Sequence, residues 1–212
     1  MQRDRTQTEQ RLLDAVEQII TESGLDQVGI NRVSRQAGIT KILIYRYFGG
    51  LDGLLEAYYK QKRFPRVGID LNFDELKDRP VTEILDKLCE VTLQEYRKLR
   101  QNVQMQEFLK ADLLGSDVVS NPIVNEREGQ LRQLIDGISL VLHRSTGRPF
   151  SAIVICAMTF LTFMSQQKRS ILDIDLNTEE GWSQIESAMR TIYKGIGLLL
   201  ESQSVDSPEK PL

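Results

Sequence analysis

The sequence predicts an all-α protein, and three observations lead to that fold class. Apolar residues recur at three- and four-residue spacings along most of the 212 residues, which is the period of an α-helix. No apolar-polar alternation with a hairpin turn signal interrupts this pattern. Residues 28–48 contain two short apolar-periodic segments joined by a tight turn. We therefore expect helices throughout, with a helix-turn-helix near the N-terminus.

The first helix is expected to begin at residues 6–9, where Thr6 and Glu9 fit a capping box. Its apolar positions lie on one helical face and are Leu12, Ala15, Val16, Ile19 and Ile20. Ser23 and Gly24 end it. This helix supplies a core face for the two that follow.

The helix-turn-helix is expected at about residues 29–48. Ile30, Val33 and Ala37 share one face of its first helix. Gly38 suits the left-handed position that ends a helix, and Thr40 is a good N-cap for the next one. The sequence therefore predicts a three-helix N-terminal domain over residues 6–66.

The remaining chain is divided by proline, glycine and capping residues. A fourth helix is expected from about residue 51 to 63, followed by a connection over residues 64–80 with one short helical turn. Residues 80–110 predict one long amphipathic helix or two joined end to end. Further helices are expected at 121–143, 148–164 and 179–199, then a disordered tail at 202–212, so a second helical domain covers residues 67–201.

Charge is distributed unevenly between these two domains. Residues 1–66 hold 11 Lys and Arg against 8 Asp and Glu, whereas residues 67–212 hold 16 against 22. Residues 27–51 contain four basic residues and no acidic ones, in a chain of net charge −3. A local basic patch on an acidic protein indicates a polyanionic partner. The N-terminal domain is therefore the part expected to bind nucleic acid.

The sequence also argues against several other classes of protein. The longest apolar run, residues 152–164, is shorter than the roughly 20 residues of a membrane span, and no export leader opens the chain, so we expect a cytoplasmic protein without a membrane partner. Cys89 and Cys156 predict packing roles. Enzyme motifs such as the P-loop and G-x-S-x-G do not occur, so neither catalysis nor a cofactor is expected. A calcium-loop rhythm beginning at Asp173 fails at Thr178 and Gln184.

At the helix-turn-helix the chain resembles the TetR-type (tetracycline-repressor-like) transcriptional regulators. The resemblance covers about residues 10–58. The matching positions are the 15–20 helix, Gly24, Val33, Ala37-Gly38-Ile39-Thr40, Ile44-Tyr45, Phe48, and Leu54-Leu55 with Ala57. It implies an all-helical DNA-binding domain followed by a helical domain that binds a small effector and dimerises through its last two helices.

Several positions depart from the pattern of that family. Gly29 stands where a threonine usually caps the second helix and meets a phosphate, and Leu51 where a lysine usually contacts the backbone. Ile42 and Leu43 replace residues that are often small or hydroxylated, and Tyr47 replaces a histidine. The resemblance therefore implies DNA binding with two phosphate anchors missing.

The helix that Thr40 caps is expected to read DNA. Its first turn carries Lys41, Ile42 and Leu43, and the first turn of a recognition helix reaches base edges in the major groove. Ile42 and Leu43 suit the C5-methyl group of thymine, while Lys41 suits either guanine or a phosphate. The other expected contacts, to phosphates or nearby bases, are Asn31, Arg32, Tyr45, Arg46 and Tyr47. Two alternatives to DNA binding remain: the segment is a plain helical hairpin, or a protein partner covers Ile42 and Leu43.

The second domain offers weaker signals for a ligand and a partner subunit. An effector pocket is predicted where Leu93, Tyr96, Met105, Phe108, His143 and Phe160 converge, although such residues also suit an ordinary core. Small residues let helices approach closely in the last two helices, at Ala152, Ala157, Ala188, Gly195 and Gly197. The 152–164 helix is expected to be buried on both sides. These features predict a two-fold homodimer with a four-helix seam.

The function predicted from the sequence is a dimeric, effector-responsive repressor that binds a palindromic operator in double-stranded DNA. Its two recognition helices would lie about 34–36 Å apart, or a multiple of that spacing. The alternative is a helical ligand-binding or adaptor protein with weakened DNA binding, which the residues at Gly29 and Leu51 favour.

Overall fold

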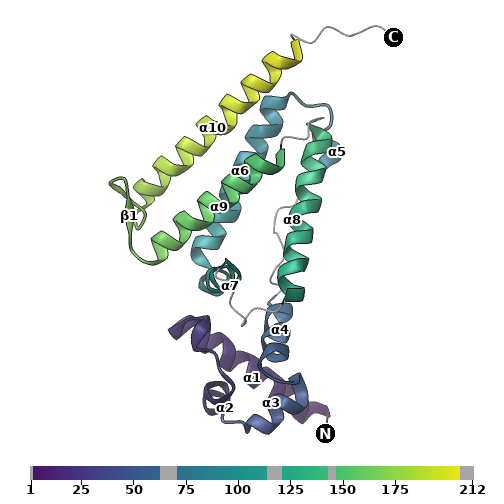
Figure 1. The fold of residues 1–212 in the computed structure, drawn as a ribbon, viewed down its shortest axis with the longest axis vertical. Coiled ribbons are helices and arrows are strands. Elements are labelled where there is room, and N and C mark those ends of the chain that lie inside the picture. The colour runs from purple at the N-terminus through teal and green to yellow at the C-terminus, as the bar shows by residue number, and fades with distance from the viewer. Residues whose placement is uncertain (1, 63–70, 114–120, 143–146, 206–212) are drawn as a thin grey trace. The chain divides into compact units, whose positions relative to one another are not determined.

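The computed structural model describes residues 2–62, 71–113, 121–142 and 147–205 of the chain (Figure 1). It is all-α, as predicted, apart from one small hairpin among the described residues. By its contacts the chain forms two compact units, residues 1–67 with 102–132, and residues 68–101 with 133–212. The first is called the N-terminal unit and the second the C-terminal unit below.

The N-terminal unit contains the helix-turn-helix. Its elements are α1 (Gln2–Ser23), η1 (Leu25–Gln27), α2 (Ile30–Ala37), α3 (Lys41–Phe48), α4 (Leu51–Gln61), α7 (Val103–Leu113) and the first part of α8 (Asn121–Val141). The five apolar positions predicted for the first helix are all buried. Val33 of α2, Ile44 of α3 and Leu54 of α4 are also fully enclosed. The predicted hydrophobic face is therefore confirmed.

The start of α1 differs from the prediction. Thr6 does not cap the helix, because α1 already begins at Gln2. Two side-chain interactions one turn apart accompany the extra turn: the Arg5 Nε donates to Glu9 over 2.8 Å, and the Thr8 hydroxyl donates to the Asp4 carbonyl over 2.8 Å. A side-chain pair such as Arg5 and Glu9 stabilises a helix at this spacing, so the capping-box pattern lies inside the helix rather than at its start.

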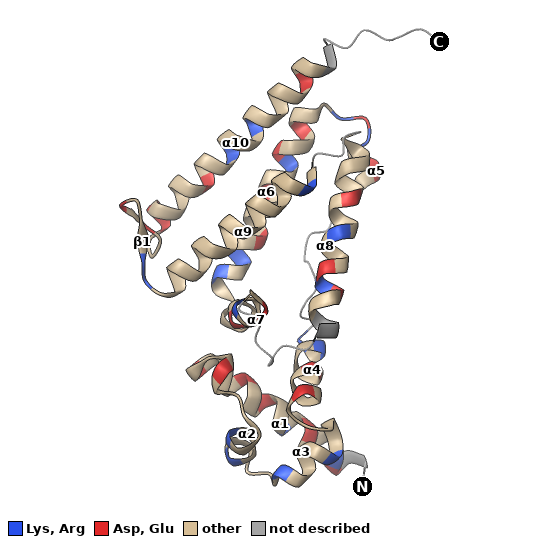
Figure 2. Ribbon diagram, in the orientation of Figure 1, with Lys and Arg blue, Asp and Glu red and all other residues tan. Residues whose placement is uncertain are grey.

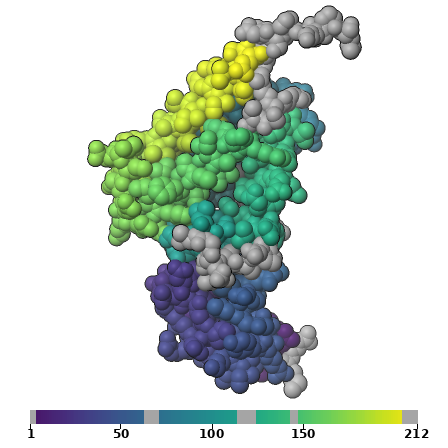
Figure 3. All heavy atoms as spheres, viewed as in Figure 1, coloured from purple at the N-terminus to yellow at the C-terminus, as the bar shows by residue number. Residues whose placement is uncertain are grey.

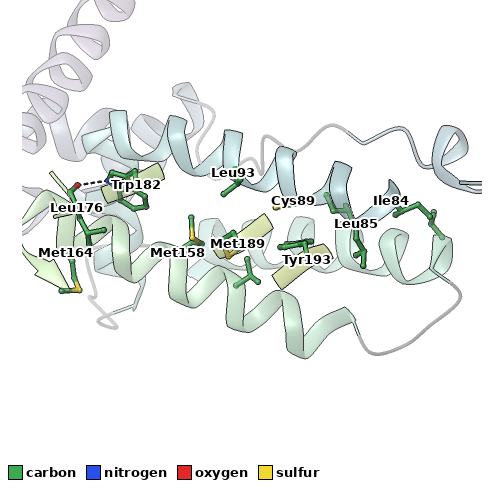
Figure 4. Packing of buried hydrophobic residues seen from close by; sticks show 13 residues of the cluster. Ile84, Leu85, Cys89, Leu93, Met158, Met164, Leu176, Trp182, Met189 and Tyr193 are labelled. Carbon is green, nitrogen blue, oxygen red and sulfur yellow. Dashed lines mark hydrogen bonds between the residues drawn. The ribbon is translucent and has the colours of Figure 1, made fainter. Parts of the chain in front are cut away.

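The C-terminal unit is built around α6 (Val81–Gln101). α9 (Gly147–Gln166) and α10 (Glu179–Val205) both pack on α6, and the short α5 (Phe73–Leu76) is the predicted helical turn of the connection. Figure 4 shows Cys89 and Leu93 of α6 facing Met158, Met189 and Tyr193 in this core. The 80–110 segment forms two helices, α6 and α7. Asn102 lies between them, and its side chain accepts a hydrogen bond from the Met105 amide over 2.9 Å.

A hairpin that the sequence did not predict connects α9 to α10. Its strands β1 (Ser170–Ile171) and β2 (Ile174–Asp175) pair antiparallel, and both turn residues, Leu172 and Asp173, have positive φ angles of 49° and 63°. Asparagine and glycine usually fill such a turn, which is why the signal was missed. Thr178 caps α10, because its hydroxyl accepts from the Gly181 amide over 3.1 Å.

α10 is longer than predicted. It continues to Val205, so residues 202–205 of the expected disordered tail are helical, and the rest of that tail lies outside the described residues. The sequence division at residue 66 also differs from the contact pattern, because α7 and residues up to Arg132 group with the N-terminal unit. A functional division of the chain at residue 66 stays a prediction.

α9 is long and apolar enough to cross a membrane by length and composition alone. One such helix is weak evidence, since the core helix of a soluble protein has the same properties. Val154, Met158 and Thr162 are buried in the C-terminal unit, whereas Ile153 and Phe160 are exposed. Within one chain this helix is therefore buried on one side only, and burial of its other side in a dimer stays a prediction.

Candidate nucleic-acid interface

The turn between α2 and α3 is held by backbone and side-chain hydrogen bonds. Gly38 adopts the predicted left-handed conformation, with φ of 63°. The Ile39 amide donates to the Ser34 carbonyl over 3.0 Å, and the Ser34 hydroxyl donates to the Ile39 carbonyl over 2.5 Å. From α1, the Arg11 guanidinium donates to the Ala37 carbonyl over 2.7 Å. These contacts fix the angle at which α3 leaves α2.

The N-caps of the two helices occupy their predicted positions. Gly29 caps α2 and Thr40 caps α3, both with extended backbone. Neither makes a side-chain capping hydrogen bond, so the Thr40 hydroxyl is exposed at the start of α3. First-turn amides of a helix have no intrahelical partner and attract anions. The starts of α2 and α3 therefore both present backbone donors.

The outer face of α3 combines apolar and basic side chains. Ile44 is completely buried, while on the opposite side Ile42 is 70% exposed. Lys41, Tyr45 and Arg46 are also exposed, and Leu43 and Tyr47 are half-buried. A single exposed isoleucine is ordinary on a protein surface, so the side chains around Ile42 decide what this face can bind. The positive charges around it indicate that the partner is anionic.

α2 contributes two of the predicted contacts to this surface. Asn31 is exposed, and Arg32 is half-buried with its guanidinium donating to the Ser23 hydroxyl over 2.6 Å. Figure 2 shows the lysines and arginines of α2 and α3 as blue segments, while acidic segments colour α1 red. The basic character of the N-terminal unit is thus concentrated on the helix-turn-helix.

α4 packs closely behind α3. A Cβ atom on Gly53 would lie 1.8 Å from the Phe48 carbonyl oxygen, so only glycine permits this approach. Leu51, where the resemblance expected a lysine, is half-buried at the first position of α4. The backbone of α3 is therefore supported from its rear by α4, while the Arg11 hydrogen bond from α1 holds the end of α2.

Arg5 is a residue of this region that sequence reasoning missed. Its guanidinium lies over the Tyr47 ring, 5.1 Å from the ring centre, so a basic side chain from α1 reaches the recognition helix. The hydrogen bond to Glu9 raises the pKa of Arg5 above its ordinary value. The missed signal was the extension of α1 before Thr6, which the i,i+4 pair of Arg5 and Glu9 could have revealed.

The residues predicted to line an effector pocket are distributed over both units. Met105 and Phe108 belong to the N-terminal unit, where Phe108 is buried against the Tyr59 ring with centroids 4.8 Å apart. Leu93, Tyr96 and Phe160 belong to the C-terminal unit; Leu93 is buried, and Phe160 is 58% exposed. His143 lies outside the described residues. Their convergence on one ligand stays a prediction.

Three comparisons with known proteins bear on this surface. Residues 12–58 match the family described as bacterial regulatory proteins, tetR family. A 52-residue segment is 44% identical to the HTH-type transcriptional regulator BetI 2 of Chromohalobacter salexigens. That alignment covers 24% of this chain and 25% of the relative, so the chain matches about a quarter of the relative's length.

Two solved structures align over most of the chain at low identity. One is native NalD of Pseudomonas aeruginosa, described as the secondary repressor of the MexAB-OprM multidrug efflux pump, with 15% identity, a TM-score of 0.47 and coverage of 89% of this chain and 96% of that one. The other is the TetR transcriptional regulator SCO0520 of Streptomyces coelicolor, with 17% identity, a TM-score of 0.35 and coverage of 88% and 97%.

Proposed function

We propose that this chain, whose residues 12–58 match the tetR family of bacterial regulatory proteins, is a member of that family and a dimeric repressor that binds operator DNA and responds to a small molecule. The outer face of α3 carries the proposal. There the exposed Ile42 lies among Lys41, Tyr45 and Arg46, within the segment that matches the family. A major groove offers both thymine methyl groups and flanking phosphates to such a face.

Each side chain of this face has a proposed role. Ile42 and Leu43 contact thymine methyl groups, and Lys41 contacts guanine or a phosphate. Tyr45, Arg46 and Tyr47 donate to phosphates. These proposed contacts are completed by Thr40 at the start of α3 and by Asn31 and Arg32 of α2. Because the Arg32 guanidinium is bonded to Ser23, it reaches DNA only if that hydrogen bond is shared or exchanged.

The proposed dimer uses the outer faces of α9 and α10, and both helices are visible on the face of the C-terminal unit that Figure 3 shows. On α9 the exposed apolar and small residues follow helical spacing, at Ala152, Ile153, Cys156, Ala157 and Phe160. On α10 they are Ala188, Ile192, Gly195, Leu198 and Leu199. Two such stripes suit a four-helix seam around a two-fold axis.

Gly197 is excluded from this seam, contrary to the sequence prediction. It is buried, and a Cβ atom there would lie 3.1 Å from Thr82 Cγ2 of α6. Its role is therefore to let α10 approach α6 within one chain. In the proposed dimer the two α3 helices lie about 34–36 Å apart, or a multiple of it, which requires a palindromic operator.

The effector is proposed to bind in the C-terminal unit and to change the spacing of the two DNA-binding heads. Couplings of this kind are typically about 1–3 kcal/mol. Tyr96 is a candidate contact, because its hydroxyl lies 3.1 Å from the Ile155 carbonyl and 3.2 Å from the Thr159 hydroxyl and so links α6 to α9. A molecule that exchanges these hydrogen bonds would alter the packing of α9. A regulator of this kind works in the cytoplasm, beside the DNA.

The deciding experiment selects binding sites from a random duplex pool with the full-length chain. We expect a palindromic consensus rich in thymine at the contacted positions, and binding that weakens steeply with salt. Placing that consensus upstream of a reporter tests repression, which should be relieved by an effector found in a thermal-shift screen. If no sequence is enriched at low salt, the proposal fails.

The alternative is a ligand-binding or adaptor protein whose DNA contacts have decayed. Gly29 and Leu51 favour it, because neither side chain can donate a hydrogen bond to a phosphate. The same selection distinguishes the two functions, since an adaptor would dimerise and bind its ligand without enriching any duplex.

A further inference from the structure

The first turns of α1 bring a basic side chain to the recognition helix. The Arg5 guanidinium lies over the ring of Tyr47, with its central carbon 5.1 Å from the ring centre, and its Nε donates to Glu9 over 2.8 Å. Arg5 is exposed and Tyr47 is half-buried. A guanidinium has five N–H donors in a planar fork, so holding one of them to Glu9 still leaves a fork that can bind an oxyanion.

Helical spacing shows where this pair lies relative to the bases. Ile44 of α3 faces the core, so Ile42 and Arg46 point outward. Tyr47 lies on the flank that it shares with Leu43, and Tyr45 lies on the other flank. A recognition helix in the major groove has phosphate backbone along both flanks. Arg5 therefore extends the flank that Tyr47 occupies.

We infer that Arg5 and Tyr47 together form a phosphate site, so that Arg5 is a further DNA-backbone contact beyond the helix-turn-helix. The guanidinium lies over the Tyr47 ring, to whose face a cation is attracted, and both groups present donors to one stretch of backbone. The inference rests on the proposed function. Arg5 would add a backbone anchor to a helix-turn-helix whose Gly29 and Leu51 offer no side-chain donor.

Glu9 sets how readily the site binds a phosphate. Its carboxylate is 2.8 Å from the Arg5 Nε, and a DNA phosphate would compete with it for the same guanidinium. Exposed ion pairs of this kind are weak, so exchange of one oxyanion for another is feasible. Removing the Glu9 charge should therefore strengthen DNA binding, whereas removing the Arg5 charge should weaken it.

The test measures affinity over a range of salt concentrations for a duplex selected by the wild-type chain and for an unrelated duplex of equal length. Arg5→Ala should lower the slope of log affinity against log salt by about 0.9, the value for one phosphate contact. It should weaken binding roughly tenfold at moderate salt. Both duplexes should lose the same factor, because a backbone contact carries no base information.

Arg79→Ala is the matched control. Arg79 is equally exposed and forms the same i,i+4 ion pair, with Glu83 at 3.2 Å, but on the C-terminal unit. Arg79→Ala removes the same charge at a position outside the proposed DNA-binding surface, so the salt slope should stay unchanged. Arg5→Lys should retain the slope and lose part of the affinity, because the charge remains while the planar fork is lost. Glu9→Gln should strengthen binding a few-fold, and it leaves Arg5 in place if Arg5→Ala proves unstable.

Three outcomes overturn the inference. One is an unchanged salt slope in Arg5→Ala. If the melting temperature falls at the same time, Arg5 stabilises the fold and does not contact a phosphate. Another is an equal loss of salt slope and affinity in Arg79→Ala, because Arg5 would then act through the overall charge of the chain and not through a phosphate contact. The third is the absence of selective binding by the wild-type chain, which overturns the proposed function as well. The first two leave the proposed function intact.

Discussion

α3 and α9 both expose large apolar side chains, but their surroundings differ. On α3, Ile42 lies between Lys41 and Arg46 in an eight-residue helix. On α9, Ile153 is 67% exposed, and the helix carries no charged residue after Arg148. We propose that a partner covers the exposed apolar side chains in both places. The charges beside them separate the two partners: a polyanion for α3 and a second apolar surface for α9.

The largest expected effect follows from placing a charge on α9. Phe160→Glu should convert the dimer to a monomer at micromolar concentration, because a carboxylate in the seam would be buried without a partner, a cost of roughly 3 kcal/mol or more. Sedimentation measures the result. DNA affinity should fall with it, since only a dimer engages two half-sites.

Leu140→Glu on α8 is the control for that variant. Leu140 is also highly exposed but lies outside the α9 and α10 stripes, so the change should leave the dimer intact. A dimeric Phe160→Glu chain, or a monomeric Leu140→Glu chain, would place the interface elsewhere.

The apolar face of α10 depends on ion pairs that hold this helix on α6. Glu186 is buried, and it accepts from Arg97 while Arg190 donates to Glu90 over 2.6 Å. Glu186→Gln should therefore destabilise the chain by roughly 2 kcal/mol, because the arginines lose their counter-charge. Denaturant unfolding at neutral pH measures this. Glu83→Gln, in an exposed pair with Arg79, should cost almost nothing.

The same carboxylate predicts a pH dependence. The hydrogen bond from Arg97 lowers the pKa of Glu186 in the folded state. Its contribution to stability is thus fully present above the unfolded pKa of about 4.3, and it is lost as the pH falls through the lowered folded value. The wild-type chain should lose more stability than Glu186→Gln over that acid range. Parallel stability curves for the two chains would argue against the contribution of this carboxylate.

A smaller effect is expected from shortening the apolar contact on α3. Ile42→Ala should lose about 1 kcal/mol of binding at one thymine position and nothing at the others, because a methyl contact discriminates one base pair. Site selection with the variant measures it. Ile153→Ala on α9 truncates an equally exposed isoleucine and should leave the base preferences unchanged. A uniform loss on every duplex would contradict the assignment of Ile42 to a base.

The contrast between α3 and α9 was only partly predictable from the sequence. The helix-turn-helix was predicted well because its signals are local: Gly38 needs a left-handed backbone, and Val33 and Ile44 follow helical spacing. The exposure of Ile153 and Phe160 in a single chain was not predicted, because a helix that is apolar nearly all round is expected to be buried on both sides. Arg5 was missed because its contact with Tyr47 joins residues far apart in the chain. The assignment of Phe108 and Leu93 to different units likewise depends on tertiary packing.

Leu172 supplies the smallest expected effect and a third kind of exposed apolar residue, neither beside basic residues nor on a helical stripe. It is 89% exposed and has a φ of 49° in the turn between β1 and β2. A left-handed backbone costs an L-residue about 1–2 kcal/mol, and asparagine tolerates it better. Leu172→Asn should therefore raise the stability of the chain by up to about 1 kcal/mol, measured by denaturant unfolding, without changing sedimentation or DNA affinity.

Leu140→Asn, at an exposed helical leucine, should instead lower the stability of the chain by a few tenths of a kcal/mol, because asparagine is the poorer helix former. If Leu172→Asn weakened the dimer, the hairpin tip would belong to the interface, and the division between α3 and α9 would need a third docking element.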